Sequence, residues 1–506
     1  MGAEKLFTKL EALIRPSAAD SYAASITEWF DKTYGATCEA ASAERGEIAG
    51  HLRARSHDGF ITEEVGSCLD ALMEVIDDLP PDRAAWVRKL VDTYKRERAL
   101  TGEFIQRKTG VTTAARRAWA AARAESNFSL FASSLREAVS IMREEAQMRG
   151  AGDRRDDIYG VLVNLWEPGF PMDRLAVIFD GMRDFTVPLL QRIRDTGIKP
   201  NTSFLDGRFD PRDLLPLSLT LMRTLGFDMS RGGLDETTHP FCSRVTPSDV
   251  RSMTRFTEGF RSWFFGIVHE IGHALYEQGA CGVSDWMSPD GVQVSLSIHE
   301  SQSRTWENFV GRGSSFWEYF YPILCSHLPQ FVDVPLDEFL RATNAVTPGC
   351  IRTNADEVTY NLHIIIRFEL ERALFNGDIS VDDLPSEFND RMDRYLGIRP
   401  PNAAQGILQD IQWSIGYFGY FPTYTLGNLF MAQVAERFAA ENRYYVNEFR
   451  TGNFGILLEY LREMVHKTGY TDDIDGALRR ITGSPLDPGY WRRYIMSRVG
   501  PVYGLS

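Results

Sequence analysis

The first part of the chain has the apolar spacing of helices. Between Lys5 and about Gln147, apolar residues recur three and four positions apart, as in LFTKLEALI, SITEWFDKTY, CLDALMEVIDDL and AWVRKLVDTYKRERAL. This spacing gathers apolar side chains on one face of an α-helix, so we predict that several long helices open the protein. The stretches RGAGDRRDD and TGIKPNTSFLDGRFDPRD are rich in turn-forming residues and predict loops.

The helical spacing lapses between Gly232 and Phe256. The stretch FCSRVTPSDVRSMTRF contains two short runs of β-forming residues on either side of the turn sequence TPSD. We therefore predict a small β-hairpin. Its edge would either receive an extended peptide by strand addition or only cover the core, and the sequence favours neither role.

A helical pattern returns from Trp263 to Glu277, WFFGIVHEIGHALYE. His269 and His273 project from one face of this predicted helix, one turn apart, and Glu270 lies about 60° round from His273. Neutral imidazoles suit zinc, which in catalytic sites takes three protein ligands and leaves a fourth position for water. The Glu270 carboxylate can remove a proton from that water. The alternative is a pair of structural histidines in a buried helix, but the HExxH spacing favours a metal site.

The third ligand must come from another part of the chain. Glu277 is too far along the same helix to reach the metal. It is either a plain surface carboxylate or a carboxylate that orients the ring of His273. Turn residues in GACGVSDWMSPDG and a second helical run, SLSIHESQSRTWENFV, predict a helix–loop–helix return. This return would bring Glu300 to the metal. We expect the neighbouring His299 to point elsewhere and to be structural.

Length and charge exclude some functions. The chain has 506 residues, 43% of them hydrophobic, so it can bury a large core as one bilobed unit or as two to three domains. It has 55 Lys and Arg against 69 Asp and Glu, a net charge of −14, and no basic cluster interleaved with aromatic residues. We therefore expect no nucleic-acid partner. No run approaches the roughly 18 apolar residues of a membrane span, so we expect no membrane insertion.

The cysteines indicate a reducing compartment. They lie far apart and form no CxxC pair, which is typical of reduced thiols rather than of a disulfide framework. The sequence also begins without an apolar stretch of signal-peptide length. We therefore expect a cytoplasmic protein, in the cytosol. The six cysteines are Cys38, Cys68, Cys242, Cys281, Cys325 and Cys350.

Six motifs follow one another between His239 and Asn428. They are HPF from His239, HEIGHALYEQG from His269, HESQSR from His299, IRTNAD from Ile351, GILQDIQW from Gly406 and GYFGYFPTYTLGN from Gly416. Together, and in this order, they resemble the motifs of the carboxypeptidase Taq family of metallopeptidases. The resemblance implies a mainly α, zincin-type fold, a helical ellipsoid divided by a groove, with a small β-sheet next to the active-site helix, similar to angiotensin-converting enzyme and neurolysin.

The resemblance also implies an organisation and an activity. It implies a single metallopeptidase domain over residues 1–506 with two lobes around the groove, a motif-bearing region of about 232–430, and a homodimer. The expected partners are peptide substrates, from whose C-termini single residues are removed, with one Zn²⁺ or Co²⁺ per chain. The residues His269, His273 and Glu300 match the family's metal ligands, and Glu270 matches its general base. The helix geometry and the spacing had indicated the same four residues.

The resemblance selects three further residues along the groove. In the family, HPF and IRxxAD line the substrate groove, which here selects His239, Arg352 and Asp356. We expect Arg352 to bind the terminal carboxylate of the substrate, because a guanidinium fork matches two carboxylate oxygens. The alternative for Arg352 is a structural ion pair with Asp356 or Glu357. We expect His239 to act beside the metal, on the developing oxyanion.

The last candidate residues are three tyrosines of the aromatic motif and Gln412, which departs from the family motif. At least one of Tyr417, Tyr420 and Tyr424 is expected to donate its hydroxyl to the oxyanion, although aromatic runs are more often packing. We take Tyr420 as the catalytic residue and the other two as substrate-binding residues. Gln412 stands where the family motif GxxQDxHW has histidine, and an amide can bind substrate but cannot titrate. Its alternative role is to hold Asp410 or a loop backbone.

The sequence therefore indicates a metal-dependent carboxypeptidase of the zinc type. One alternative is a dipeptidyl carboxypeptidase or oligopeptidase on the same fold. Another is a peptide-binding protein that has lost catalysis and keeps zinc for structure. The intact Glu270 argues against this last alternative, because a structural zinc site needs no base and usually closes all four positions with Cys or His.

Overall fold

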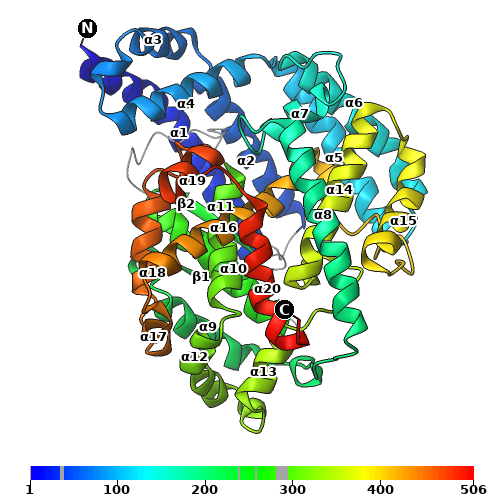
Figure 1. The fold of residues 1–506 in the computed structure, drawn as a ribbon. Coiled ribbons are helices and arrows are strands. Elements are labelled where there is room, and N and C mark those ends of the chain that lie inside the picture. Colours follow the sequence, from blue (N-terminus) through cyan, green and yellow to red (C-terminus); the bar gives the residue numbers. More distant parts are fainter. Residues whose placement is uncertain (1, 35–38, 238–239, 257–258, 281–294, 506) are drawn as a thin grey trace. The chain divides into compact units, whose positions relative to one another are not determined.

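Helices follow the apolar spacing of the sequence along most of the chain (Figure 1). Among the described residues, one three-stranded sheet interrupts them, so the predicted fold class, mainly α with a small sheet, is confirmed. The computed structural model describes residues 2–34, 39–237, 240–256, 259–280 and 295–505.

The chain divides into two compact units, each assembled from three segments of the sequence. The single domain with two lobes around a groove stays a prediction. Unit 1 comprises Met1–Arg98, Thr202–Thr343 and Val434–Pro485, and unit 2 comprises Ala99–Asn201, Asn344–Gln433 and Leu486–Ser506.

Unit 1 contains the sheet and the helices around it. The predicted opening helices up to Arg98 form here, and α1 joins two of the predicted segments into one helix that runs through Pro16. The helices of unit 1 are α1 (Ala3–Thr33), α2 (Glu39–Phe60), α3 (Glu63–Met73), α4 (Pro81–Arg98), α9 (Pro211–Thr224), α10 (Phe260–Gly279), α11 (Leu296–Arg304), α12 (Ser314–His327), α13 (Leu336–Thr343), α17 (Tyr445–Arg450), α18 (Gly455–Leu461) and α19 (Ile474–Thr482).

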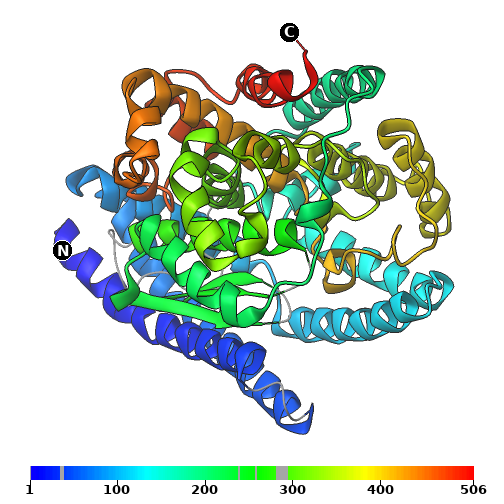
Figure 2. The ribbon, with the colours of Figure 1, turned by 90° about the horizontal axis from the view of Figure 1, so that it is seen from below.

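The sheet of unit 1 confirms the predicted hairpin and adds a strand to it. Strands β2 (Phe241–Thr246) and β3 (Asp249–Thr254) pair in antiparallel fashion, and β1 (Gly232–Glu236) pairs with β3 in parallel. The first residue of β1, Gly232, allows this pairing, because a Cβ there would lie 1.8 Å from the carbonyl oxygen of Val250. The sheet packs against α10, and β2 packs against α1 (Figure 2).

Unit 2 consists of helices joined by loops and contains no strand among its described residues. Its core includes ring contacts between Tyr159, Phe179 and Phe368, which join three of its helices. The helices of unit 2 are α5 (Gly102–Ala124), α6 (Ser129–Met148), α7 (Asp157–Asn164), α8 (Met172–Asp195), α14 (Glu357–Asn376), α15 (Leu384–Leu396) and α20 (Pro488–Tyr503), and α16 (Pro422–Glu441) begins in unit 2 and ends in unit 1.

Both predicted loops lie between helices of the structure. RGAGDRRDD lies between α6 and α7, and TGIKPNTSFLDGRFDPRD lies mostly between α8 and α9, as predicted. The turn-rich stretch after α10 lies mainly in residues 281–294, outside the described residues. No described helix is long and apolar enough to cross a membrane.

Candidate metal centre and active site

Helix α10 carries the HEIGH motif and is anchored by aromatic packing. Phe260 and Phe264 lie in its first turns and are fully buried. The ring of Phe260 lies 5.2 Å from that of Phe331, and the ring of Phe264 lies 4.7 Å from that of Trp317. Burying large aromatic side chains is a major stabilising contribution, so this end of α10 is held firmly and the motif one turn further on has a defined position.

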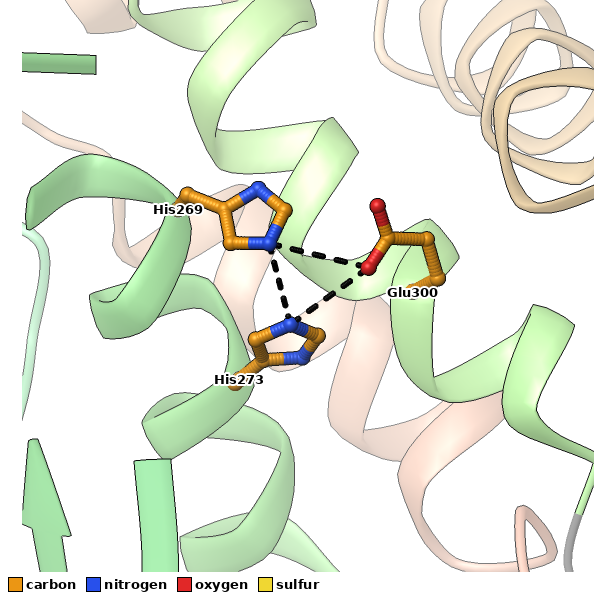
Figure 3. A group of neighbouring side chains, drawn as sticks. All are labelled: His269, His273 and Glu300. Carbon is orange, nitrogen blue, oxygen red and sulfur yellow. Dashed lines mark hydrogen bonds and ion pairs between the residues drawn. The ribbon is translucent and has the colours of Figure 1, made fainter. Parts of the chain in front are cut away.

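The three predicted ligands converge on one point. His269 and His273 project from α10, and Glu300 projects from α11 (Figure 3). The two Nε2 atoms are 3.1 Å apart, and Glu300 Oε2 lies 3.6 Å from His269 Nε2 and 3.5 Å from His273 Nε2. These three residues form the group of potential metal ligands that is found among the described residues.

The spacing and chemistry of these donors fit a catalytic zinc-type ion. Bonds of about 2.0–2.2 Å at tetrahedral angles separate neighbouring ligand atoms by about 3.3–3.5 Å, close to the distances between these three atoms. Two imidazoles and one carboxylate are also a usual set of three protein ligands for such an ion. The residues therefore fit a divalent metal with one position left for water.

A glycine brings the two ligand-bearing helices together. Gly272 lies inside the HEIGH motif, and a Cβ at this position would lie 2.6 Å from the Cα of Ser303 and 2.8 Å from the carbonyl oxygen of Gln302. A side chain here would push α11 away from α10. Glycine therefore allows the approach that places Glu300 beside the histidines.

A second carboxylate from the same helical stretch supports the first ligand. Glu307 lies in a π-helical turn, Thr305–Val310, that continues α11, and its Oε2 is 2.9 Å from Nδ1 of His269. Because a carboxylate accepts, Nδ1 carries the proton and Nε2 keeps its lone pair for a metal. Arg304 donates to both Glu300 and Glu307, at 2.7 and 3.0 Å. The sequence analysis did not assign Glu307, although its position seven residues after Glu300 places both on one helix face.

The prediction for His299 is wrong, and Glu277 is not a plain surface carboxylate. Glu277 accepts a hydrogen bond from His299, with Glu277 Oε1 3.0 Å from His299 Nε2, and it also accepts one from Tyr470 at 2.6 Å. His299 does not point away from the site, because its ring stacks on that of His273 with centroids 4.3 Å apart. Glu277 therefore supports His273 through His299 and not through a direct bond.

The surroundings of the metal centre shift the pKa values of its ionisable side chains far from their ordinary values. Burial raises the pKa of Glu270 to about 7, and its Oε2 is buried without a hydrogen-bond partner among the described residues. Burial and the neighbouring His299 lower the pKa of His273 to about 3, so this imidazole is neutral at pH 7. For Glu307, burial alone would raise the pKa, but Arg304 and His269 lower it to about 2. At pH 7 the imidazole of His273 is therefore neutral and the Glu307 carboxylate beside His269 is ionised. Glu270 keeps one oxygen without a hydrogen-bond partner among the described residues.

Arg352 lies in unit 2, and its ion pair is not the one considered from the sequence. Its Nε and Nη2 lie 3.0 and 2.9 Å from Oδ1 of Asp410, and its Nη1 lies 3.3 Å from the Tyr360 hydroxyl. Arg367 approaches the other oxygen of Asp410, with Nε at 2.6 Å. Burial alone would raise the pKa of Asp410, but the two guanidinium groups lower it to about 2. Two cations thus share one carboxylate in a buried part of unit 2.

The other candidate residues of unit 2 have distinct surroundings. Asp356 caps α14, where its oxygens accept from the backbone N–H groups of Val358 and Thr359, both at 3.0 Å, and from Thr347 N at 2.9 Å. The side-chain oxygen of Gln412 is buried and has no hydrogen-bond partner in the part of the chain that the structure describes. That oxygen therefore accepts from no backbone N–H group of the described loops.

The tyrosines of the aromatic motif lie next to one another. Ring centroids of Tyr417 and Tyr420 are 5.7 Å apart, and those of Tyr420 and Tyr424 are 5.3 Å apart. Tyr417 is 40% exposed, the most of the three, and the Arg352 guanidinium lies 5.0 Å from the Tyr424 ring. The arrangement joins the arginine and the tyrosines in one neighbourhood of unit 2. His239 lies outside the described residues.

Comparisons with known proteins agree with the motifs and the geometry. A sequence model described as carboxypeptidase Taq (M32) metallopeptidase matches residues 10–499. Carboxypeptidase 1 of Bacillus subtilis is 35% identical over 486 residues, which cover 96% of each chain. Thermostable carboxypeptidase 1 of Thermus thermophilus is 36% identical over 457 residues, covering 88% of this chain and 89% of the relative.

The fold agrees as well. The crystal structure of an M32 carboxypeptidase from Deinococcus radiodurans R1 superposes with a TM-score of 0.93 at 31% identity, covering 99% of this chain and 100% of that one. The fold, the order of the motifs and the geometry of the ligand atoms all agree with this family. The chain therefore belongs to the carboxypeptidase Taq (M32) family of metallopeptidases and is a metal-dependent carboxypeptidase.

Proposed function

We propose that His269, His273 and Glu300 hold one Zn²⁺ or Co²⁺ ion, and that the enzyme releases single amino acids from the C-termini of peptides. The observation that carries this proposal is the convergence of three ligand atoms within 4.8 Å of one another, next to Glu270, whose Oε2 has no hydrogen-bond partner among the described residues. When bound, the ion supplies Lewis-acid polarisation of the scissile carbonyl and a lower pKa of water.

In this proposal Glu270 carries the proton. Its pKa of about 7 suits a group that must both accept and release a proton near neutral pH. Glu270 takes a proton from the attacking water, whose oxygen bonds to the carbon of the last peptide carbonyl. It then passes that proton to the leaving amine, and the C–N bond breaks. Glu307 and Arg304 keep His269 and Glu300 in their orientations throughout.

We propose that Arg352 binds the terminal carboxylate of the substrate. Arg352 and Arg367 together carry two positive charges, and Asp410 supplies one negative charge. Buried charges are stable only when they are compensated, so this cluster favours a second anion. The free C-terminal carboxylate of a peptide supplies such an anion, and the guanidinium fork recognises its two oxygens.

The remaining candidates take supporting parts in the proposal. Tyr420, with His239, donates to the developing oxyanion, and Tyr417 and Tyr424 contact the substrate. Gln412 offers its unpaired oxygen to a peptide N–H group. The contacts of Asp356 support a capping role, and through it a role in fixing the segment that carries Arg352.

Location and assembly are part of the same proposal. We propose a cytosolic enzyme, which the four described cysteines, Cys68, Cys242, Cys325 and Cys350, support because all are free thiols. We also propose a homodimer with a groove-divided fold similar to that of angiotensin-converting enzyme and neurolysin. Size-exclusion chromatography with light scattering tests the assembly, and a monomer at micromolar concentration contradicts it.

One experiment separates the proposed activity from its alternatives. A peptide of known sequence is incubated with the enzyme, and the products are followed by mass spectrometry with and without a chelator. We expect a ladder with single-residue steps from the C-terminus that the chelator abolishes and added Zn²⁺ or Co²⁺ restores. Two-residue steps or internal cuts would indicate a dipeptidyl carboxypeptidase or an oligopeptidase. No cleavage with any metal would indicate a peptide-binding protein.

A further inference from the structure

A buried carboxyl group in unit 2 fastens the loop that carries the tyrosines. Glu371 lies on α14 and is fully buried. Its Oε1 accepts a hydrogen bond from Trp413 Nε1 at 2.6 Å. Its Oε2 accepts from the backbone N–H of Gly419 at 2.8 Å and from the Tyr159 hydroxyl at 2.9 Å. Trp413 and Gly419 stand on either side of Tyr417, so one side chain holds both ends of this segment.

The opposite side of the loop is held against α7 and the residues that follow it. Gly419 has a φ of +75°, and a Cβ there would lie 2.5 Å from the backbone nitrogen of Val163. Trp166 Nε1 donates to the carbonyl oxygen of Phe418 at 2.8 Å. The Trp166 ring also contacts the rings of Tyr417 and Tyr420, with centroids 4.6 and 5.1 Å away. The loop is therefore clamped between Glu371 and this aromatic contact.

The chemistry of the clamp requires a carboxyl group. An indole N–H and a backbone N–H can only donate, so both oxygens of Glu371 must accept. Burial raises the pKa of Glu371 to about 7 while the three donors oppose this rise. A protonated carboxyl group still accepts on both oxygens and can donate its proton to the Tyr159 hydroxyl. An amide has only one accepting atom, so glutamine would set its NH₂ against an N–H donor.

Burying the carboxyl group of Glu371 costs free energy that an apolar side chain at this position would not cost. Within the part of the chain that the structure describes, Glu371 makes no ion pair, and Arg367 acts on it only through space. Burying a carboxyl group without a directly bonded cation is costly. We propose that Glu371 is a positioning residue for the peptidase reaction, which fixes the segment from Trp413 to Tyr420 so that Tyr417 and Tyr420 meet the substrate in one arrangement. This proposal rests on the function proposed above for the tyrosines.

The test compares two buried carboxyl groups of unit 2. Glu145 is also buried and also accepts on both oxygens, from Lys108 at 2.5 Å and from Arg149 at 3.0 Å, and neither of these donors belongs to the segment from Trp413 to Tyr420. Glu371→Gln and Glu145→Gln are assayed with Zn²⁺ on one peptide, and their melting temperatures are measured. We expect Glu371→Gln to lower kcat tenfold or more with little change in KM. Glu145→Gln should lower the melting temperature as Glu371→Gln does, but it should keep kcat/KM within about twofold of the parent.

Two further measurements link the effect to the loop. Hydrogen exchange of a peptide covering residues 413–420 should be faster in Glu371→Gln and unchanged in Glu145→Gln. Glu371→Gln should also cost less kcat in a Tyr417→Phe or Tyr420→Phe background than in the parent, because residues that act as one unit are not additive. If Glu371→Gln does not fold, Trp413→Phe removes one donor of the clamp and should lower kcat in the same direction.

The outcomes distinguish the inference from the function on which it rests. An inactive parent with unchanged loop exchange in Glu371→Gln would overturn both. If the parent is active, a Glu371→Gln enzyme with kcat within twofold of the parent overturns the positioning role alone. An equal loss of kcat on Glu371→Gln in the parent and in the two tyrosine variants would also overturn the positioning role, because the loss would then not depend on the tyrosine hydroxyls.

Discussion

Glu270 lies in an environment that differs from that of an ordinary carboxylate. It is buried, it has an oxygen without a partner among the described residues, and burial raises its pKa to about 7. Because it is not a predicted ligand, Glu270→Gln should keep the metal and lose at least a hundredfold in kcat, the scale typical of a lost general base. Metal content by mass spectrometry and kcat on one peptide check both parts.

A ligand variant provides the control for Glu270. Glu300→Ala should lose metal and activity together, because two imidazoles alone bind a divalent ion more weakly. Near-normal turnover by Glu270→Gln would remove this residue from the mechanism. Normal metal content in Glu300→Ala would remove Glu300 from the ligand set.

Arg352 gives a prediction about substrate recognition. If its fork binds the terminal carboxylate, amidating the C-terminus of a peptide removes a charge-assisted contact of about 1.5–3 kcal/mol, or tenfold and more in kcat/KM. Arg352→Ala should lose activity on the free acid and respond little to amidation. Arg352→Lys keeps the positive charge but lacks the guanidinium fork, so its kcat/KM on the free acid should lie between that of the parent and that of Arg352→Ala. A preference for free acids that survives Arg352→Ala would assign the contact to another residue.

At the scale of elements, α5 and α6 are joined by a buried charge cluster that makes stability depend on pH. Burial alone would raise the pKa of Glu145, but Lys108 and Arg149 lower it below its ordinary value of 4.5. A lowered folded-state pKa stabilises the protein above the unfolded value, and this contribution is lost as the pH falls through the folded value. The melting temperature of the parent should therefore fall below about pH 4.5, and less steeply in Glu145→Gln. Parallel curves for the two proteins would exclude this cluster as a source of acid sensitivity.

At the scale of the whole molecule, the metal should contribute to the stability of unit 1. Its ligands come from α10 and α11, and only the folded chain brings them together. A ligand that binds only the native state at a concentration a thousand times its Kd stabilises that state by about 4 kcal/mol. Removal of the metal by a chelator should therefore lower the melting temperature in calorimetry, and added Zn²⁺ should restore it. Glu300→Ala should respond weakly to both treatments, and an equal response would argue for another site.

Local spacing along the chain is enough to identify the parts of the site that lie on one helix. Two histidines four residues apart lie on one helix face whatever surrounds that helix, so HEIGH indicated a metal clamp with an adjacent base. Helical spacing and a second helical run were enough to indicate Glu300, and alternating β-forming residues were enough to indicate the hairpin of β2 and β3. The order of the motifs also indicated the family.

The contacts between groups far apart in the sequence depend on how the elements pack. The pairing of β1 with β3, the stacking of His299 on His273, the ion pair of Arg352 with Asp410 and the clamp at Glu371 all join segments with no common period. A buried charge or strand edge takes the partner that packing brings within reach, and many carboxylates in the sequence are equally suitable by type. Periodicity therefore predicts how a side chain leaves its own helix, whereas the packing of the elements determines what it contacts.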